Sequence, residues 1–90
     1  MFYVYVIENL VEDVYVGYST DLKKRLKEHN QGLNFSTRSK LPWKIIYYEA
    51  CVDNDDARRR EKYLKTTQGR RMLKLRLKEY FYKRSKNLII

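Results

Sequence analysis

The sequence of 90 residues lacks the features that mark secreted, membrane-spanning and zinc-binding proteins. Cys51 is its single cysteine, so no disulfide can form within the chain, and no Cys/His cluster has the spacing of a zinc site. No apolar run approaches the roughly 18 residues of a membrane-spanning helix. Residues 1–10 have neither the basic start nor the cleavage site of a signal peptide. These absences predict one small domain in the cytoplasm.

Negative charge is also scarce. The chain has 20 Lys and Arg residues against 11 Asp and Glu residues, which gives a net charge of +9. Residues 1–20 contain no Lys or Arg, whereas residues 57–90 contain thirteen and only two acids. This charge favours a polyanionic partner, with nucleic acid the first candidate and an acidic membrane or ribosome the second. The alternative is that the excess charge only keeps a small protein soluble.

Three segments have the composition of β-strands. Residues 2–7, 13–18 and 43–50 are rich in β-branched and aromatic side chains, as strands are. The first two segments are separated by a short stretch with polar ends, which predicts a β-hairpin. The chain therefore has an apolar, aromatic start that can form a sheet, followed by basic segments that can cover it.

Three helices are expected after the hairpin. The first is capped by Ser19 or Thr20 and ends at Gly32, and the second begins at Asp53 or Asn54 and runs to about residue 65. The third follows residues 66–69 and carries an apolar stripe at helical spacing, formed by Leu73, Leu77, Tyr80 and Phe81. The predicted class is α+β in the order ββαβαα, with one domain over residues 1–84 and a tail over residues 85–90.

Several residues of the hairpin and first helix are candidates for chemistry. Tyr5 lies on the first strand, and Tyr15 lies on the second, just before Gly17. Arg25 and His29 are four residues apart and therefore share one face of a helix. Tyrosines also form and pack strands well, and a single histidine often serves only as a hydrogen-bond partner. Both interpretations stay open for each of these side chains.

Glu61 is the acidic candidate. It follows three consecutive arginines in the second helix. A single carboxylate of this kind can hold Mg²⁺ together with waters and phosphate oxygens. The alternative is an ordinary helical ion pair with Lys65, four residues further on.

Taken together, these residues resemble a known family, the GIY-YIG nuclease domains. The resemblance rests on Tyr3-Val4-Tyr5, Tyr15-Val16-Gly17, Arg25, His29 and Glu61, and it covers nearly the whole chain. Ten residues separate the two tyrosines, ten separate the second tyrosine from the arginine, and four separate the arginine from the histidine. The chain is most similar to small stand-alone members of the family and to the N-terminal nuclease domain of the UvrC repair protein.

The resemblance implies a three-stranded antiparallel sheet flanked by helices, and metal-dependent cleavage of DNA phosphodiester bonds. It implies that Tyr5 or Tyr15 is the general base, with Tyr5 favoured, and that Arg25 neutralises charge on the phosphate. His29 would orient the tyrosine or relay its proton, and Glu61 would bind Mg²⁺ or Mn²⁺. Gly17 would be structural, at a place where a side chain crowds the strand end or the substrate. DNA repair or recombination is the setting that the resemblance suggests.

The sequence departs from the family pattern in three places. Tyr3 replaces the first glycine of the motif, at a position that we expect to be structural. Tyr18 follows the second motif where relatives of the UvrC type often have lysine, so the role of that lysine must come from elsewhere. Leu73 stands where some relatives place an asparagine near the site.

Two functions from different classes follow from these observations. The first is a metal-dependent DNA endonuclease, and the second is a non-catalytic basic module that retains the fold and binds nucleic acid. RNA is a second candidate substrate, and a protein partner is a candidate source of specificity, with no membrane partner expected. Ser36, Thr37 and Arg38 are expected to form a loop near the substrate. The expected phosphate contacts, for which a solvated charged face is the alternative, are Arg38, Arg58, Arg59, Arg60, Lys62, Arg70, Arg71 and Lys74.

Overall fold

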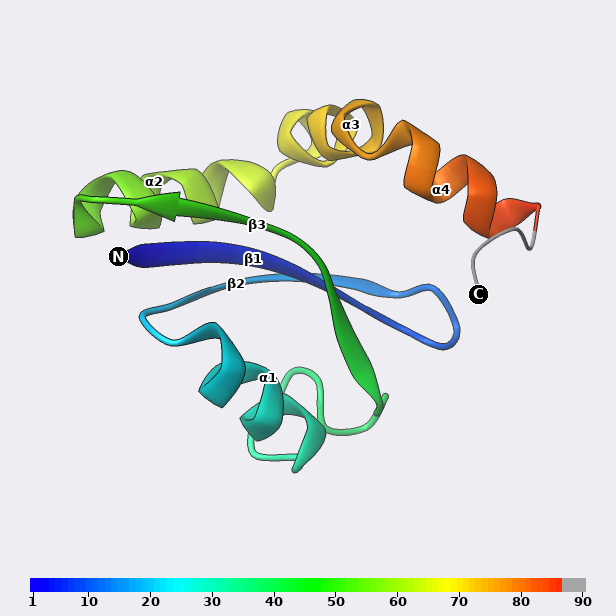
Figure 1. Ribbon diagram of the computed structural model, residues 1–90, viewed down its shortest axis with the longest axis horizontal. Coiled ribbons are helices and arrows are strands. Elements are labelled where there is room, and N and C mark those ends of the chain that lie inside the picture. The colour runs from blue at the N-terminus through cyan, green and yellow to red at the C-terminus, as the bar shows by residue number, and fades with distance from the viewer. Residues whose placement is uncertain (87–90) are drawn as a thin grey trace.

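A three-stranded antiparallel sheet lies between two layers of helices in the computed structural model, which describes residues 1–86 (Figure 1). The strands are paired in the order β2-β1-β3, so β1 is central and β2 is an edge strand. The bounds are β1 Phe2–Asn9, β2 Val14–Ser19, α1 Leu22–Asn30, β3 Trp43–Cys51, α2 Asn54–Leu64, α3 Thr67–Arg76 and α4 Lys78–Ser85. The predicted α+β class, the hairpin and the three strands are confirmed.

The register of β1 decides which side chains face each helical layer. Tyr5 lies opposite Gly17 of β2 and opposite Tyr48 of β3, so these three residues share one face of the sheet. That face packs against α1 through a cluster of Tyr5, Ile7 and Trp43. The other face packs against α2 and α3 through a separate hydrophobic cluster of Val4, Val6, Val16, Ala57, Leu64 and Leu73. Figure 1 shows α1 on one side of the sheet and α2 to α4 on the other.

The first helix begins later than its expected cap. Ser19 stays in β2, paired with Tyr3, and its hydroxyl accepts a hydrogen bond from the backbone of Asp21. The cap is instead Asp21, whose carboxylate accepts from the backbone N–H of Lys24 at 3.1 Å. Asp21 takes this role because pairing in the sheet holds Ser19 in a strand. At the other end the helix finishes at Asn30 with Gln31 as its C-cap, and Gly32 follows in the expected C′ position with φ of +76°.

The third predicted helix is two helices. The chain turns at Leu77, which ends α3 and precedes α4, so the order is ββαβααα. The apolar stripe still forms one continuous surface across the two helices. Its residues Leu73, Leu77 and Phe81 line the same small cavity beside the sheet. In α4, Tyr80 and Arg84 bond the carboxylate of Glu8, which is 2% exposed in the central strand.

The proposed domain and tail divide within α4, which extends to Ser85. Of the predicted tail, residues 87–90 lie outside the described residues. Over residues 1–86, no helix combines the length and the apolar character needed to cross a membrane.

Candidate active site

A buried hydrogen bond joins the first strand to the first helix. The Tyr5 hydroxyl lies 2.7 Å from Nε2 of His29, and the two residues are 2% and 0% exposed. Tyr5 is placed by the central strand, and His29 by the last turn of α1. Strand β1 and helix α1 therefore hold Tyr5 and His29 against each other, although the two residues are 24 positions apart in the chain.

The second ring nitrogen of His29 is also bonded. Nδ1 lies 2.7 Å from the hydroxyl oxygen of Thr37, which is fully buried. Thr37 is itself held, because its carbonyl accepts a hydrogen bond from the Trp43 indole N–H at 3.0 Å. The Asn30 side chain bonds both backbone groups of Trp43, at 2.7 and 2.9 Å. The loop between α1 and β3 is thereby folded back onto the histidine.

These surroundings set the charge states of Tyr5 and His29. Burial raises the pKa of Tyr5, the neighbouring Tyr15 raises it further, and the Arg25 guanidinium acts in the opposite direction. Burial lowers the pKa of His29, and the positive charge of Arg25 lowers it further. At neutral pH, Tyr5 is therefore a phenol and His29 is a neutral imidazole between two hydroxyl groups. Because each hydroxyl can donate or accept, both tautomers of the ring have partners.

Tyr15 lies beside this pair at the edge of the sheet. Its ring packs edge-on against His29, with the ring centres 5.4 Å apart, and edge-on against Trp43. Unlike Tyr5, Tyr15 is only half-buried. The Lys65 ammonium, one residue beyond the end of α2, lies 5.8 Å from the centre of the Tyr15 ring. This lysine reaches past edge strand β2, since α2 packs on the opposite face of the sheet.

Glu61 lies on the same side of α2 as Lys65. Its carboxylate is 3.1 Å from the Lys65 ammonium and 3.9 Å from the Arg58 guanidinium, and its side chain is 17% exposed. The ion pair considered for Glu61 from the sequence is therefore present. Glu61 also lies close enough to Tyr5 for its negative charge to act on that hydroxyl, although burial is the main reason that the pKa of Tyr5 is raised.

Arg25 completes the group. Its guanidinium forms an ion pair with Glu28 at 3.2 Å, and its charge acts on both Tyr5 and His29. Its side chain is 38% exposed, so it can also reach a bound phosphate. The structure thus brings together Tyr5, Tyr15, Gly17, Arg25, His29 and Glu61.

The carboxylates available to a metal ion are few. Among residues 1–86 there is no group of three His, Cys, Asp or Glu side chains that could hold a metal ion. Glu61 fits the pattern of a Mg²⁺ or Mn²⁺ site that uses one carboxylate and completes its shell with waters and substrate phosphates. A metal ion there would compete with Lys65 for the carboxylate.

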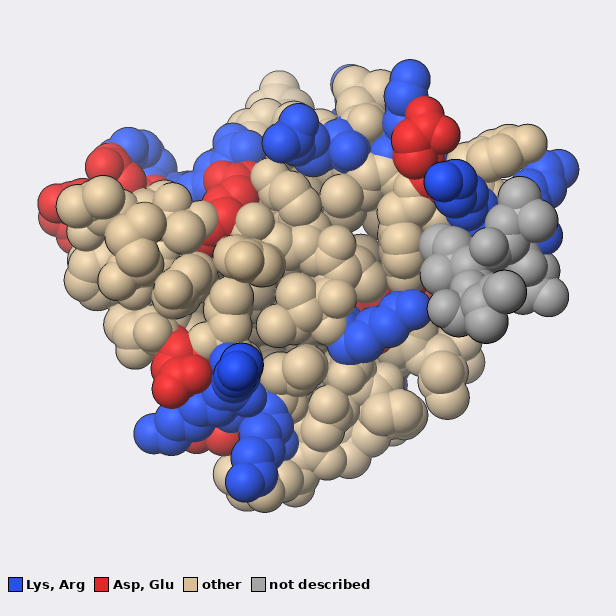
Figure 2. All heavy atoms as spheres, viewed as in Figure 1, with Lys and Arg blue, Asp and Glu red and all other residues tan. Residues whose placement is uncertain are grey.

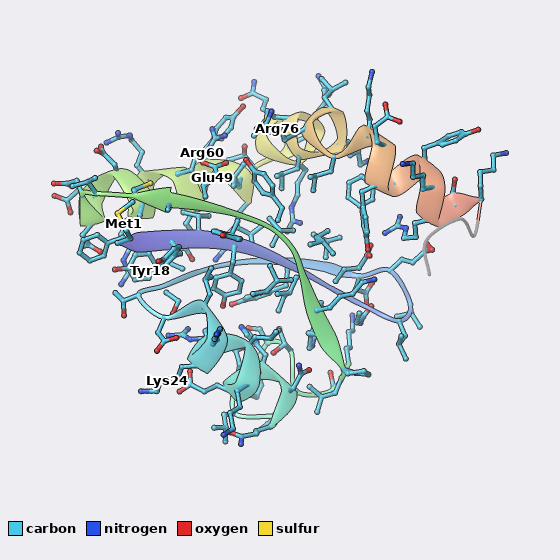
Figure 3. All side chains as sticks on the ribbon, viewed as in Figure 1. Met1, Tyr18, Lys24, Glu49, Arg60 and Arg76 are labelled. Carbon is cyan, nitrogen blue, oxygen red and sulfur yellow. The ribbon has the colours of Figure 1, made fainter. Side chains whose placement is uncertain are left out.

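The expected phosphate contacts differ in their environments. Arg58 lies 3.6 Å from the Tyr18 ring centre, Arg59 bonds Asp56, and Arg60 forms three short contacts with Glu49 (Figure 3). Arg70 lines the small apolar cavity beside the sheet. The exposed members are Arg38, Arg58, Arg59, Lys62, Arg71 and Lys74. Figure 2 shows Lys and Arg gathered over α1 and along α2 and α3.

In the loop expected near the substrate, one residue is exposed and another is buried. Arg38 is exposed and lies 4.6 Å from the ring centre of Phe35. Thr37 points inward to His29, a role that the sequence did not reveal because a buried threonine in a polar loop has no local signature. Its only available signal was its place in the loop that follows His29.

The structure also accounts for two departures from the family pattern. Lys65 stands beside Tyr15, which offers a source for the positive charge that Tyr18 does not provide. The sequence alone identifies Lys65 only as a helical partner of Glu61. Leu73 is 3% exposed in the core beneath α3, so a polar side chain does not fit at this position.

Several known proteins have sequences similar to this one. The chain is 34% identical to the UPF0213 protein CPE1444 of Clostridium perfringens, over 98% of this chain and all of that protein. It is 41% identical to the UPF0213 protein SpyM3_1077 of Streptococcus pyogenes, over 76% of this chain and 75% of that protein.

A solved structure is similar as well. The solution NMR structure of the UPF0213 protein BH0048 from Bacillus halodurans aligns with a TM-score of 0.50 and 30% identity, over 81% of this chain and 82% of that one. Residues 1–76 match the family described as the GIY-YIG catalytic domain, and this match includes all the residues of the candidate site. The chain therefore belongs to the GIY-YIG family.

Proposed function

We propose that this protein is a divalent-metal-dependent endonuclease that hydrolyses phosphodiester bonds in DNA. The observation that carries the proposal is the buried 2.7 Å contact between Tyr5 and His29, with Tyr15, Arg25 and Glu61 all acting on Tyr5. A module that only bound nucleic acid would not need two tyrosines, a histidine and a carboxylate gathered at one sheet edge. The resemblance of the motif residues to the UvrC nuclease domain suggests DNA repair or recombination as the setting.

Exposure favours Tyr15 over Tyr5 as the residue that contacts the attacking water. Tyr5 is 2% exposed and its hydroxyl already faces His29, whereas Tyr15 is half-buried on an edge strand. Burial also keeps Tyr5 in its neutral phenol form. The Lys65 ammonium lies 5.8 Å from the centre of the Tyr15 ring and adds positive charge at this edge of the sheet. This differs from the preference for Tyr5 that the resemblance suggested, and the reason is burial.

The remaining residues then have distinct tasks. Tyr15 takes the proton of the water whose oxygen forms the new bond to phosphorus. Arg25 donates hydrogen bonds to the phosphate oxygens and stabilises the negative charge that develops on them. A divalent ion at Glu61 would supply further positive charge to the phosphate and the leaving oxygen. Tyr5 and His29 are positioning residues, because His29 packs against the ring of Tyr15, Tyr5 bonds His29, and neither reaches solvent.

The test is cleavage of labelled single-stranded, duplex and branched DNA with Mg²⁺, with Mn²⁺ and with chelator. Glu61→Gln keeps the shape of the side chain and removes its charge, and we expect it to abolish metal-dependent cutting. The matched control is Glu79→Gln, which removes an exposed carboxylate from α4 and should leave the rate unchanged. Tyr15→Phe should reduce the rate by about a hundredfold or more, the usual contribution of a general base.

Two results would contradict the proposal. Cutting that survives in Glu61→Gln would place the metal elsewhere or indicate a contaminating nuclease. Tight, salt-sensitive binding without cutting on any of the three substrates would support the non-catalytic module instead.

A further inference from the structure

A groove lined mostly by apolar and aromatic side chains adjoins the candidate active site on the same face of the sheet. It has a volume of about 460 Å³ and lies between the start of α1 and the exposed parts of β1 and β3. Its lining includes Tyr3, Leu22, Leu26, Ile45 and Tyr48. Leu22, Leu26 and Ile45 also pack against the cluster that contains Tyr5, so the groove is continuous with the site.

Two tyrosines form the aromatic wall of this groove. The ring centres of Tyr3 and Tyr48 are 6.0 Å apart, and the rings meet edge to face at 67°. Tyr48 is 54% exposed, although it lies directly opposite the almost fully buried Tyr5. The contact with Tyr3 supports the ring of Tyr48, while about half of the Tyr48 surface stays exposed. An aromatic surface held in this way offers a stacking platform.

The charge around the groove suits a nucleic acid strand. Lys23 lies in its lining, and the exposed Lys24 projects from the same turn of α1 (Figure 3). The acidic residue at the rim, Asp21, directs its carboxylate to the backbone of Lys24 as the cap of α1. Phosphates can therefore follow the lysines of α1, while the apolar floor receives a less polar group.

We propose that this groove binds an unpaired nucleobase next to the bond that is cut, stacked on Tyr48. The proposal rests on the proposed nuclease function and names its substrate class, which is single-stranded nucleic acid or the single-stranded part of a branched molecule. In a duplex both flat surfaces of each base are covered by its neighbours, so only an unpaired base can stack on a protein ring. Basic side chains alone would bind single strands and duplexes without this distinction.

The test measures binding and stacking in chelator, so that no cleavage occurs. Fluorescence anisotropy compares labelled single-stranded and duplex DNA of equal length, with wild type, Tyr48→Ala, Tyr48→Phe and Tyr82→Ala. We expect Tyr48→Ala to weaken single-strand binding about tenfold, as the loss of one stacked base does. Duplex binding should be unchanged, and Tyr48→Phe should bind as wild type does, because it retains the ring.

Tyr82→Ala is the matched control, because Tyr82 is similarly exposed at 57% but lies in α4, away from the groove. A second measurement uses 2-aminopurine in the single strand, whose emission falls when it stacks on an aromatic ring. Wild type should quench this emission at one position of the strand, and Tyr48→Ala should not.

The inference is overturned if Tyr48→Ala binds single strands as tightly as wild type, or if it weakens single-strand and duplex binding equally. Either outcome leaves the nuclease proposal intact, since cutting with Mg²⁺ or Mn²⁺ is measured separately on wild type. Failure of wild type to cut, with Tyr48-dependent binding preserved, would instead refute the nuclease proposal while retaining the base-binding groove.

Discussion

Gly17 leaves the space that the side chain of Tyr5 occupies. The two residues are opposite each other in the β1–β2 register, and a Cβ on Gly17 would overlap both the hydroxyl oxygen and the ring carbon Cζ of Tyr5, with Cε1 only 2.8 Å away. The Tyr5 ring therefore lies directly across the backbone of β2. In this position the Tyr5 hydroxyl reaches His29. The glycine of the second motif and the tyrosine of the first are thus parts of one packing arrangement.

Gly17→Ala is expected to displace the Tyr5 ring and break its hydrogen bond to His29. Overpacking at a buried site of this kind costs about 1–3 kcal/mol of unfolding free energy. Denaturant unfolding of Gly17→Ala measures this cost directly. In a Tyr5→Leu background the same alanine should cost much less, because the ring that it meets is absent. Equal costs in the two backgrounds would show that the close approach of the Tyr5 ring is not the reason for the glycine.

Thr37→Val removes one hydroxyl without changing the shape of the side chain. His29 Nδ1 would then be buried without a partner, and this should cost about 1–3 kcal/mol of stability. Thr37→Ser restores the hydroxyl and should recover most of the loss. NMR of the His29 ring nitrogens provides a second measurement, because removal of the Nδ1 partner favours the tautomer with the proton on Nε2. An unchanged tautomer in Thr37→Val would argue against this positioning role.

The stability of the protein should fall as the pH drops below about 6.5. Burial lowers the pKa of His29 below its ordinary value of 6.5, so the unfolded chain binds a proton that the folded protein excludes. The contribution is fully present above pH 6.5 and decreases as the pH falls toward the pKa of the folded state. Denaturant unfolding between pH 7.5 and pH 5.5 checks this, with His29→Gln as the comparison. The variant should show a smaller decrease, and an identical decrease would assign the effect to other groups.

Lys65→Met should lower the rate of DNA cleavage. The substitution removes the ammonium that lies 5.8 Å from the centre of the Tyr15 ring and 3.1 Å from the Glu61 carboxylate. We expect a loss of about tenfold, which corresponds to about 1.4 kcal/mol of transition-state stabilisation. Lys78→Met is the control, because Lys78 is an exposed lysine of α4 and forms no part of the assembled site. A rate of Lys65→Met that matches wild type would exclude this role for Lys65.

Arg60 and Arg71 are expected to act differently on DNA binding. Arg60 donates three hydrogen bonds of 3.0 to 3.2 Å to Glu49, whereas Arg71 is exposed on α3. Arg71→Met should reduce the slope of log affinity against log salt by about 0.7 to 0.9, the effect of one lost phosphate contact. Arg60→Met should leave this slope unchanged and lower the unfolding free energy by about 1 kcal/mol, because its ion pair is partly exposed. The reverse pattern would assign the phosphate contact to Arg60.

Local patterns were enough to predict the three strands and the first two helices, and the resemblance to the family identified the candidate site residues. Alternation places Tyr5 and Gly17 on strands, and i, i+4 spacing places Arg25 and His29 on one helix face, because these periods follow from backbone geometry. The helix caps were predicted less well, since the choice between Ser19 and Asp21 depends on where pairing in the sheet ends. The break at Leu77 likewise has no Gly or Pro to mark it.

Only the tertiary structure decided how these residues meet. Thr37 reaches His29 because the loop after α1 folds back onto the helix, and Lys65 reaches Tyr15 from a helix that is far away in the chain. Burial separates the two tyrosines, making Tyr5 a neutral anchor and leaving Tyr15 accessible. The sequence determined which chemical groups the protein has, because residue type and period are local properties. The fold determined their distances and exposure, because these depend on contacts that no short segment contains.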